Sequence, residues 1–225
     1  MKIIKVIAKW LFVICVPVIL LTASVTWAAN SAWLYHYGFD KYDVGETTGL
    51  EQPELDKAAD GLISYFNSGE EFIDVTVMKD GEPFQLFNER ETGHLKDVKA
   101  LFRLVYWLLL GTLIYGLLYV GISLFLWKDK QRTAQGLVYG SGLTLVLMAA
   151  MGVVTLVDFN WFFYRFHLIS FANDLWMLNP ATDYLIMLFP QGFWFEAALF
   201  CVAVAVAGAL ILGGLGWWLL KRERV

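Results

Sequence analysis

The stretch WFEAALFCVAVAVAGALILGGLGWWLL, residues 194–220, contains one ionisable side chain, Glu196, which lies near its start. An α-helix needs about 20 mostly apolar residues to cross a membrane, and this stretch is longer. Three further apolar runs occupy residues 10–29, 100–127 and 136–157, and none has an ionisable residue near its middle. Because backbone polar groups in hydrocarbon must be paired within their own segment, each run is predicted to be a transmembrane helix.

The composition of the whole chain agrees with a membrane protein. Of its 225 residues, 58% are hydrophobic and only 17% are charged, whereas about a quarter of the residues in a soluble domain are charged. This excludes a disordered chain, a disulfide scaffold and a nucleic-acid binder with a basic face. Cys15 and Cys201 both lie inside apolar runs, so they are expected to be buried thiols and neither a disulfide nor metal ligands.

The first apolar run has an alternative interpretation. Three lysines precede it and Trp27-Ala28-Ala29 closes it, which is also the pattern of a cleavable signal peptide. The run is long for a signal peptide, and Pro17 is tolerated in a retained helix. We therefore expect a fourth membrane helix here.

The charges predict the orientation in the membrane. The segment before the first run, the 128–135 loop and the segment after the fourth run together hold nine basic and two acidic residues. The rest of the chain holds eight basic and nineteen acidic residues. Since positive loops remain in the cytoplasm, both termini and the 128–135 loop are predicted to be cytoplasmic, and residues 30–99 and 158–193 to face outward.

The first outer segment, residues 30–99, is predicted to form a small α/β cap. Apolar residues recur at helical spacing after Pro53, an extended stretch follows at 72–77, and the turn at 79–82 allows residues 84–87 to pair back as a hairpin. Such a hairpin is too apolar and too small to be stable alone. We expect it to cover a lipid-facing pocket, within a single membrane domain that spans residues 1–225.

The second outer segment, residues 158–193, is too aromatic for a solvated loop and too polar for a membrane span. Tyrosine and tryptophan favour the headgroup level of a bilayer, so interfacial helices joined by turns are expected here. The fold class is therefore an all-α polytopic membrane protein with four spans, an α/β cap and an interfacial segment. Polar groups in such a segment indicate a site at the outer leaflet.

Two histidines are candidates for chemistry. If residues 88–99 are helical, then Glu91, His94 and Asp97 share one face of the helix. A carboxylate beside an imidazole fixes its tautomer and raises its basicity. His167 lies in the aromatic second outer segment. The competing interpretations are a solvated charged face around His94 and a packed histidine at His167, and for the remaining histidine, His36, a structural role is preferred.

Two histidines at one membrane depth suit proton transfer in acyl chemistry, in which one imidazole accepts a proton and another donates one. The chain contains neither a GxSxG nor an HExxH motif. From these residues alone, a small membrane enzyme and a transporter or accessory protein are both possible. A metal-dependent hydrolase that uses the histidines and nearby acids is a third alternative. The absence of ionisable residues near the middle of the spans counts against an ion-coupled transporter.

Two long motifs resemble a bacterial integral membrane family that includes the lipoprotein intramolecular transacylases. The first is NERETGHLKDVK at residues 88–99, directly before the second apolar run. The second runs through the 158–193 segment and is made of FH at 166–167, NDLW at 173–176, PATDYLI at 180–186 and LFP at 188–190. The resemblance covers nearly the whole chain.

The resemblance implies a specific reaction and a set of site residues. The substrate would be a lipoprotein whose N-terminal cysteine carries an S-linked diacylglycerol, in the bacterial cell membrane. Its sn-2 acyl chain would move to the α-amino group of the same cysteine, and no cofactor or metal is implied. The functional histidines of the family correspond to His94 and His167. The resemblance further implies orienting or substrate-binding roles for Arg90, Glu91 and Asp97 in the first motif and for Asn173, Asp174 and Asp183 in the second.

The missing nucleophile fits this implied reaction. The substrate supplies both the attacking amine and the ester carbonyl, so the protein needs no serine or cysteine nucleophile. Holding the amine and the ester together gives a proximity advantage. Partners other than lipoproteins and membrane lipid are not implied, and the acyl-chain preference and oligomeric state stay open.

Overall fold

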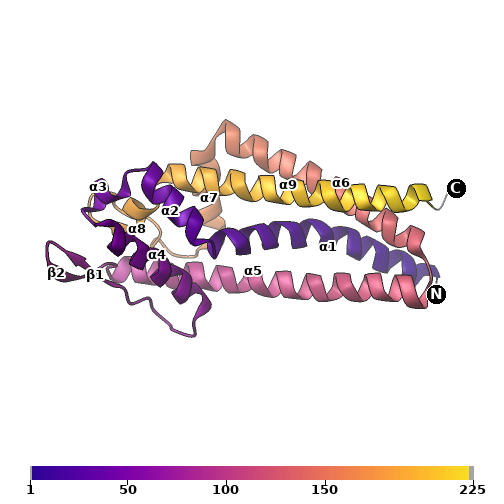
Figure 1. The fold of residues 1–225 in the computed structure, drawn as a ribbon, viewed down its shortest axis with the longest axis horizontal. Helices are drawn as coiled ribbons and strands as arrows, with labels where there is room; N and C mark the ends of the chain where they lie inside the picture. Colours follow the sequence, from indigo (N-terminus) through magenta and orange to yellow (C-terminus); the bar gives the residue numbers. More distant parts are fainter. Residues whose placement is uncertain (1, 223–225) are drawn as a thin grey trace. The chain divides into compact units, whose positions relative to one another are not determined.

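Four long helices dominate the computed structural model, which describes residues 2–222 (Figure 1). They are α1 (Lys2–Ala29), α5 (Glu89–Gly121, continued by the π-helix Ile122–Leu126), α6 (Lys130–Val157) and α9 (Gln191–Arg222). All four are long and apolar enough to cross a membrane, and each contains one predicted apolar run, except that Trp127, the last residue of the second run, lies just beyond its helix. The four-span prediction is therefore confirmed. The exact membrane boundaries stay a prediction, and Glu223 and Arg224, which entered the charge count, lie outside the described residues.

The chain divides into two compact units. The first, here called the membrane unit, comprises Met1–Thr26, Val105–Val157 and Leu199–Val225, and the second, the cap unit, comprises Trp27–Leu104 and Asp158–Ala198. The predicted organisation as a single membrane domain stays a prediction.

The membrane unit is held together by aromatic packing and by close helix approaches. Phe12 and Val16 of α1 and Tyr119 of α5 form a buried core, in which the Phe12 and Tyr119 rings stack with centroids 4.6 Å apart. A Cβ at Gly216 of α9 would lie 2.8 Å from the Ala134 carbonyl oxygen of α6, so only glycine allows this approach. Many large apolar side chains of the unit are exposed, as lipid contact requires.

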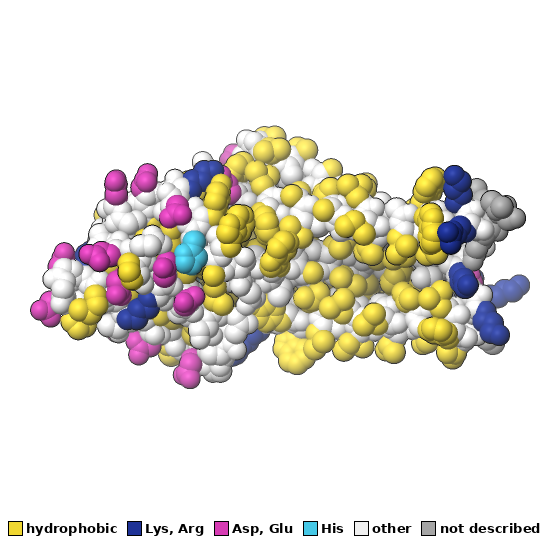
Figure 2. All heavy atoms as spheres, in the orientation of Figure 1, with side chains coloured by type: hydrophobic (Ala, Val, Ile, Leu, Met, Phe, Trp, Pro, Cys, Tyr) yellow, Lys and Arg dark blue, Asp and Glu magenta, His cyan; other side chains and the backbone are white. Residues whose placement is uncertain are grey.

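The cap unit contains short helices and one hairpin. Its own elements are α2 (Ala32–Lys41), α3 (Val44–Thr48), α4 (Gln52–Asn67), β1 (Thr76–Lys79), β2 (Glu82–Gln85), α7 (Phe159–Ser170) and α8 (Tyr184–Leu188). The predicted cap helix and hairpin are present as α4 and β1–β2, and the expected interfacial helices as α7 and α8. The helices α2 and α3 were not predicted. In Figure 2 acidic side chains gather over the elements of this unit.

The hairpin is short but well anchored. Thr76 pairs with Gln85 and Lys79 with Glu82, and the two loop residues Asp80 and Gly81 have φ of 55° and 81°. Positive φ at both positions is the type I′ geometry that matches strand twist. The first strand begins four residues later than predicted, although the Leu86 N–H still donates to the Val75 carbonyl oxygen at 2.9 Å, and the second strand covers residues 82–85 where 84–87 were predicted.

The inner face of the hairpin region is apolar and buried. Val77 is fully buried, and Val75, Leu86 and Phe87 are nearly so. A Cβ on Gly61 of α4 would lie 2.6 Å from the Val75 side chain, so α4 and this segment are in direct contact. The hairpin is thus part of the core of the cap unit. That it covers a lipid-facing pocket stays a prediction.

Candidate active site

A buried carboxylate organises the start of α5. Asn88 precedes the helix, and its Oδ1 accepts hydrogen bonds from the backbone N–H groups of Arg90 (2.9 Å) and Glu91 (3.1 Å). The Glu91 side chain reaches back and accepts from the Asn88 N–H at 2.8 Å. This reciprocal pair is a capping box, which satisfies N–H groups that a helix start leaves unpaired.

The same carboxylate also binds the start of α8. The second oxygen of Glu91 accepts a 2.6 Å hydrogen bond from the Leu185 N–H, so one side chain joins the first turns of two helices. Glu91 is only 1% exposed. Burial raises the pKa of Glu91, and the nearby Asp183 charge adds to this, although the N–H donors of Leu185 and Asn88 oppose the shift.

Asp183 ties the loop before α8 to the same place. Its Oδ1 accepts from the Asn88 amide at 3.0 Å and from the Thr182 hydroxyl at 3.1 Å, while its Oδ2 accepts from the Asn179 N–H at 2.7 Å. Asp183 is buried. Asn88 therefore links the helix cap to Asp183, and the sequence pattern had not marked Asn88 as a site residue, although an Asn-x-x-Glu capping box can be read in it.

The two candidate histidines meet directly beside this network. His94 lies one turn after Glu91 on α5, and His167 lies in the last turn of α7. Their ring centroids are 6.1 Å apart with the ring planes 32° from parallel, and both side chains are buried. The structure thus brings together two residues that are 73 positions apart in the sequence.

The hydrogen bonding of the two rings differs. The Nδ1 of His167 lies 2.7 Å from the Phe163 carbonyl oxygen. Because a carbonyl only accepts, this Nδ1 carries the proton and Nε2 of the neutral ring keeps its lone pair. The Nδ1 of His94 is buried and has no hydrogen-bond partner within residues 2–222.

Aromatic side chains surround the histidine pair. The rings of Phe163, Phe166 and Trp176 lie 4.4, 5.4 and 4.9 Å from that of His167, centroid to centroid, and Phe171 lies 5.0 Å from His94. This apolar shell lowers the pKa of both histidines by desolvation. Desolvation lowers the pKa of His94 to about 4. The neighbouring His167 adds to this shift, and the charge of Asp97 opposes it. Both imidazoles are therefore neutral at pH 7.

The expected carboxylate partner of His94 is not found. No carboxylate oxygen within residues 2–222 lies within salt-bridge distance of His94, since Glu91 is engaged by backbone N–H groups and Asp97 accepts from the Asn173 amide at 2.8 Å. The charge of Asp97 does raise the pKa of His94, as a nearby carboxylate should, but no carboxylate fixes the tautomer of His94 through a hydrogen bond to Nδ1. Helical spacing places the acids on the same face as the imidazole, but backbone and amide N–H groups occupy their oxygens.

The remaining predicted residues join the 173–179 loop to α5. Arg90 donates from Nη1 to the Met177 carbonyl oxygen at 2.9 Å, and Asn173 donates to Asp97. A Cβ on Gly93 would lie 2.9 Å from Leu175 Cδ1, so this loop packs closely against the helix. Asp174 is exposed and its side chain makes no hydrogen bond within the described part of the chain. His36, which was set aside, pairs with Asp56 at 3.1 Å on the surface.

No three His, Cys, Asp or Glu side chains among residues 2–222 gather closely enough to hold a metal ion.

Comparison with known proteins identifies the family. A family model described as "Lipoprotein intramolecular transacylase Lit" matches residues 10–194, which include both histidines and both motifs. The chain belongs to the Lit family. An uncharacterised protein of Aquifex aeolicus (strain VF5) is 26% identical over 179 residues, which cover 77% of each chain.

Solved Lit structures share the fold. The structure of the membrane-integral lipoprotein intramolecular transacylase Lit from Bacillus cereus matches with a TM-score of 0.85 at 20% identity, covering 100% of this chain and 99% of that one. A histidine-to-arginine variant of that protein matches with a TM-score of 0.78 at 20% identity and covers 99% and 95% of the two chains. Lit membership makes this chain a multi-pass membrane protein of a transacylase family, as the sequence motifs had implied.

Proposed function

We propose that the protein moves the sn-2 acyl chain of an S-diacylglyceryl-cysteine lipoprotein to the α-amino group of the same cysteine. The observation that carries this proposal is the buried pair of neutral imidazoles of His94 and His167, whose ring centroids lie 6.1 Å apart. The proposed reaction needs no serine or cysteine nucleophile, because the substrate supplies the attacking amine. Neutral imidazoles can accept a proton from an attacking amine, whereas protonated ones cannot.

His167 is the better placed general base. With Nδ1 donating to the Phe163 carbonyl, Nε2 keeps a lone pair for the substrate amine. His94, whose Nδ1 is unpaired within residues 2–222, is the partner that can exchange a proton with the glyceride oxygen. We therefore assign the general base to His167 and the proton transfer to the leaving group to His94.

The proton balance of the step closes within the site. The neutral amine attacks the ester carbonyl, an N–C bond forms, and His167 takes one proton from the nitrogen. The C–O bond to the glycerol then breaks, and the same proton, passed between the imidazoles, leaves on the glyceride oxygen. The low pKa of His94 makes its protonated form a strong acid, which favours delivery of the proton to the glyceride oxygen.

The carboxylates and amides act as positioning residues in this proposal. Glu91 and Asp183 fix the start of α5 and thereby the position of His94, which lies one turn further along the helix. Arg90, Asp97 and Asn173 hold the 173–179 loop, which contributes Trp176 to the wall of the site. Asp174 is free to contact the lipoprotein chain at the rim.

The reaction is proposed to occur at the outer leaflet of the bacterial cell membrane, with both termini in the cytoplasm. The support is the charge distribution between the segments, since positive loops stay in the cytoplasm. The acyl chains of a membrane-bound lipoprotein enter from the bilayer, and the aromatic shell excludes water that would hydrolyse the ester.

Single histidine variants with a matched control test the assignment. His94→Gln and His167→Gln in the full chain should lower conversion of a reporter lipoprotein to its lyso-form by at least about a hundredfold, as expected for loss of general acid–base catalysis. His36→Gln replaces the surface histidine and should leave conversion unchanged. The readout is fragmentation mass spectrometry of the reporter N-terminus, with membrane abundance of each variant measured in parallel. Full conversion by either site variant would contradict the proposal, and loss of folded protein alone would indicate a packing role.

A further inference from the structure

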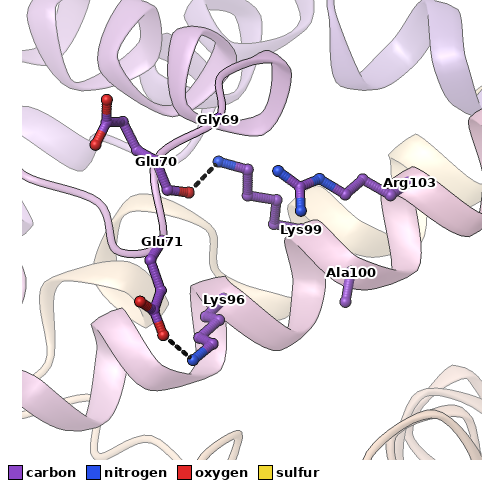
Figure 3. A pocket seen from close by; sticks show the side chains of 7 residues that line it. All are labelled: Gly69, Glu70, Glu71, Lys96, Lys99, Ala100 and Arg103. Atoms are coloured by element: carbon purple, nitrogen blue, oxygen red, sulfur yellow. Dashed lines mark hydrogen bonds and ion pairs between the residues drawn. The ribbon is translucent and has the colours of Figure 1, made fainter.

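A basic cleft lies on α5 further along the helix than the histidine site (Figure 3). Its volume is about 230 Å³, and it is lined by Lys96, Lys99, Ala100 and Arg103 of α5 and by residues 69–71 of the loop after α4. The three cations follow each other at i, i+3 and i+7, which is one face of a helix. In Figure 3 the charged groups of Lys99 and Arg103 point toward the same side, facing the loop.

Two of these cations lack a counter-charge. Lys96 is paired with Glu71 at 2.6 Å. Lys99 donates to the Ser68 hydroxyl at 3.0 Å and to the Glu70 carbonyl at 2.7 Å, and Arg103 donates to the Ser68 carbonyl at 3.2 Å. The three groups that accept from Lys99 and Arg103, one hydroxyl and two backbone carbonyls, are all neutral. Neither Lys99 nor Arg103 makes a salt bridge within residues 2–222, and the Glu70 carboxylate points away from Lys99 in Figure 3.

Burial makes the missing counter-charge costly. Lys99 is 2% exposed and its ammonium lies 3.9 Å from the centre of the Tyr65 ring. Desolvation and the adjacent charge of Arg103 lower the pKa of Lys99, and the Glu70 charge opposes them only in part. A buried charge is normally paired, so an anion in the cleft would relieve both the desolvation and the mutual repulsion.

The position of the cleft indicates where the anion comes from. Ala100 opens the apolar run of α5, and Leu104, one turn later on the same helix, is 53% exposed. On the other flank the exposed ring of Phe72 lies under the Lys96 ammonium at 4.7 Å. Basic pockets at the ends of membrane helices match the level of lipid phosphate groups, and an arginine fork suits phosphate oxygens.

We propose that this cleft binds the phosphate group of a membrane phospholipid, with Lys99 and Arg103 as its ligands. The lipid is distinct from the lipoprotein substrate, whose diacylglyceryl group carries no phosphate, so this site does not depend on the proposed transacylation. The bound headgroup bridges α5 and the 68–71 loop and so stabilises the cap unit at the membrane surface.

Lipid titration of the purified full chain tests the proposal. In neutral detergent, native mass spectrometry should show phosphatidylglycerol bound at least about tenfold more tightly than diacylglycerol, which has the same chains but no phosphate. Inorganic phosphate should neither bind at matched concentration nor raise the melting temperature. Equal binding of the two lipids would overturn the proposal, and phosphate binding as tight as that of the lipid would overturn the assignment to a phospholipid.

Variants locate the binding. Arg103→Gln, at an exposed position, should weaken phosphatidylglycerol binding about tenfold, which corresponds to loss of a charge-assisted contact. Lys99→Gln should do the same, and Lys57→Gln, which removes an exposed lysine of α4, should have no effect. Circular dichroism checks that each variant is folded. Unchanged lipid binding by folded Arg103→Gln would contradict the proposed site.

Discussion

The Phe163 carbonyl and the His167 imidazole, one turn apart on α7, decide which ring nitrogen of the site can accept a proton. A hydrogen bond of 2.7 Å to Nδ1 leaves Nε2 as the basic atom. The surrounding rings exclude water and lower the pKa of both histidines. The chemistry at this scale is thus set by one backbone carbonyl and a set of aromatic side chains, and no acidic partner of the imidazoles is required.

The pH dependence of the rate follows from these pKa values. Between pH 7 and 5.5 the rate should fall about tenfold per unit, because the substrate α-amine, with a usual pKa near 8, becomes protonated. Since the pKa of His94 is about 4 and burial lowers that of His167, protonation of the histidines should steepen the loss at a lower pH than ordinary imidazoles would. Initial rates across this range measure the slope. If the logarithm of the rate already falls by two per pH unit at pH 6, a histidine titrates at its ordinary value.

Local sequence spacing predicted which residues of the site are near each other but not what they bind. The spacing of Glu91, His94 and Asp97 on one helix face was read correctly. The partners of the acids, the Leu185 N–H and the Asn173 amide, lie 94 and 76 residues further along the chain. No periodicity within residues 88–99 could indicate these contacts. For that reason the spacing did not show that these acids bind N–H groups of other segments and leave Nδ1 of His94 without a hydrogen-bond partner within residues 2–222.

At the scale of elements, the start of α5 carries two separate interactions through one side chain. Asn88 caps the helix with its oxygen and holds Asp183 with its amide nitrogen. The capping interaction is local and can be read from the sequence, whereas the contact with Asp183 joins segments that are distant in the chain. Substitutions that retain one function and remove the other can separate them.

Asn88→Ala should lower the free energy of unfolding by about 1–3 kcal/mol, because it removes the cap and leaves a buried oxygen of Asp183 with one donor fewer. Asn88→Ser retains a capping hydroxyl and should lose about half as much. Thermal unfolding in detergent, followed by circular dichroism, measures both. Equal melting temperatures for Asn88→Ala and the unchanged protein would show that this cap does not stabilise the cap unit.

The helices and the hairpin were predicted to different degrees for physical reasons. The apolar stripe of α4 and the Asp80-Gly81 turn are strong local signals, and both a helix and a hairpin are present there, although the hairpin strands are shorter and shifted from their predicted bounds. The helix α2 mixes aromatic, glycine and charged residues without a clear period, and it is formed through packing such as that of Tyr35 and Phe39 against Phe189. Tertiary contacts of this kind are not visible in a local pattern.

At the scale of the whole molecule, the orientation in the membrane rests on charge. Glu82, in the exposed hairpin, is predicted to lie outside the cell, and Lys130, at the exposed start of α6, in the cytoplasm. In a chain with Cys15→Ala and Cys201→Ala, a membrane-impermeant maleimide should label Glu82→Cys in intact cells. It should label Lys130→Cys only after permeabilisation. The reverse pattern would place the histidine site on the cytoplasmic side.

The central claim is that the substrate supplies both the nucleophile and the acyl group, and an isotope crossover experiment tests it most directly. The purified protein in lipid vesicles receives two diacylglyceryl lipopeptides, one with heavy isotopes in both its peptide and its sn-2 acyl chain and one unlabelled. Intramolecular transfer leaves the total mass of each molecule unchanged. Fragmentation should therefore find each acyl chain on the amine of its own peptide, heavy with heavy and light with light. A heavy acyl chain on a light peptide, or free fatty acid as the main product, would contradict the account.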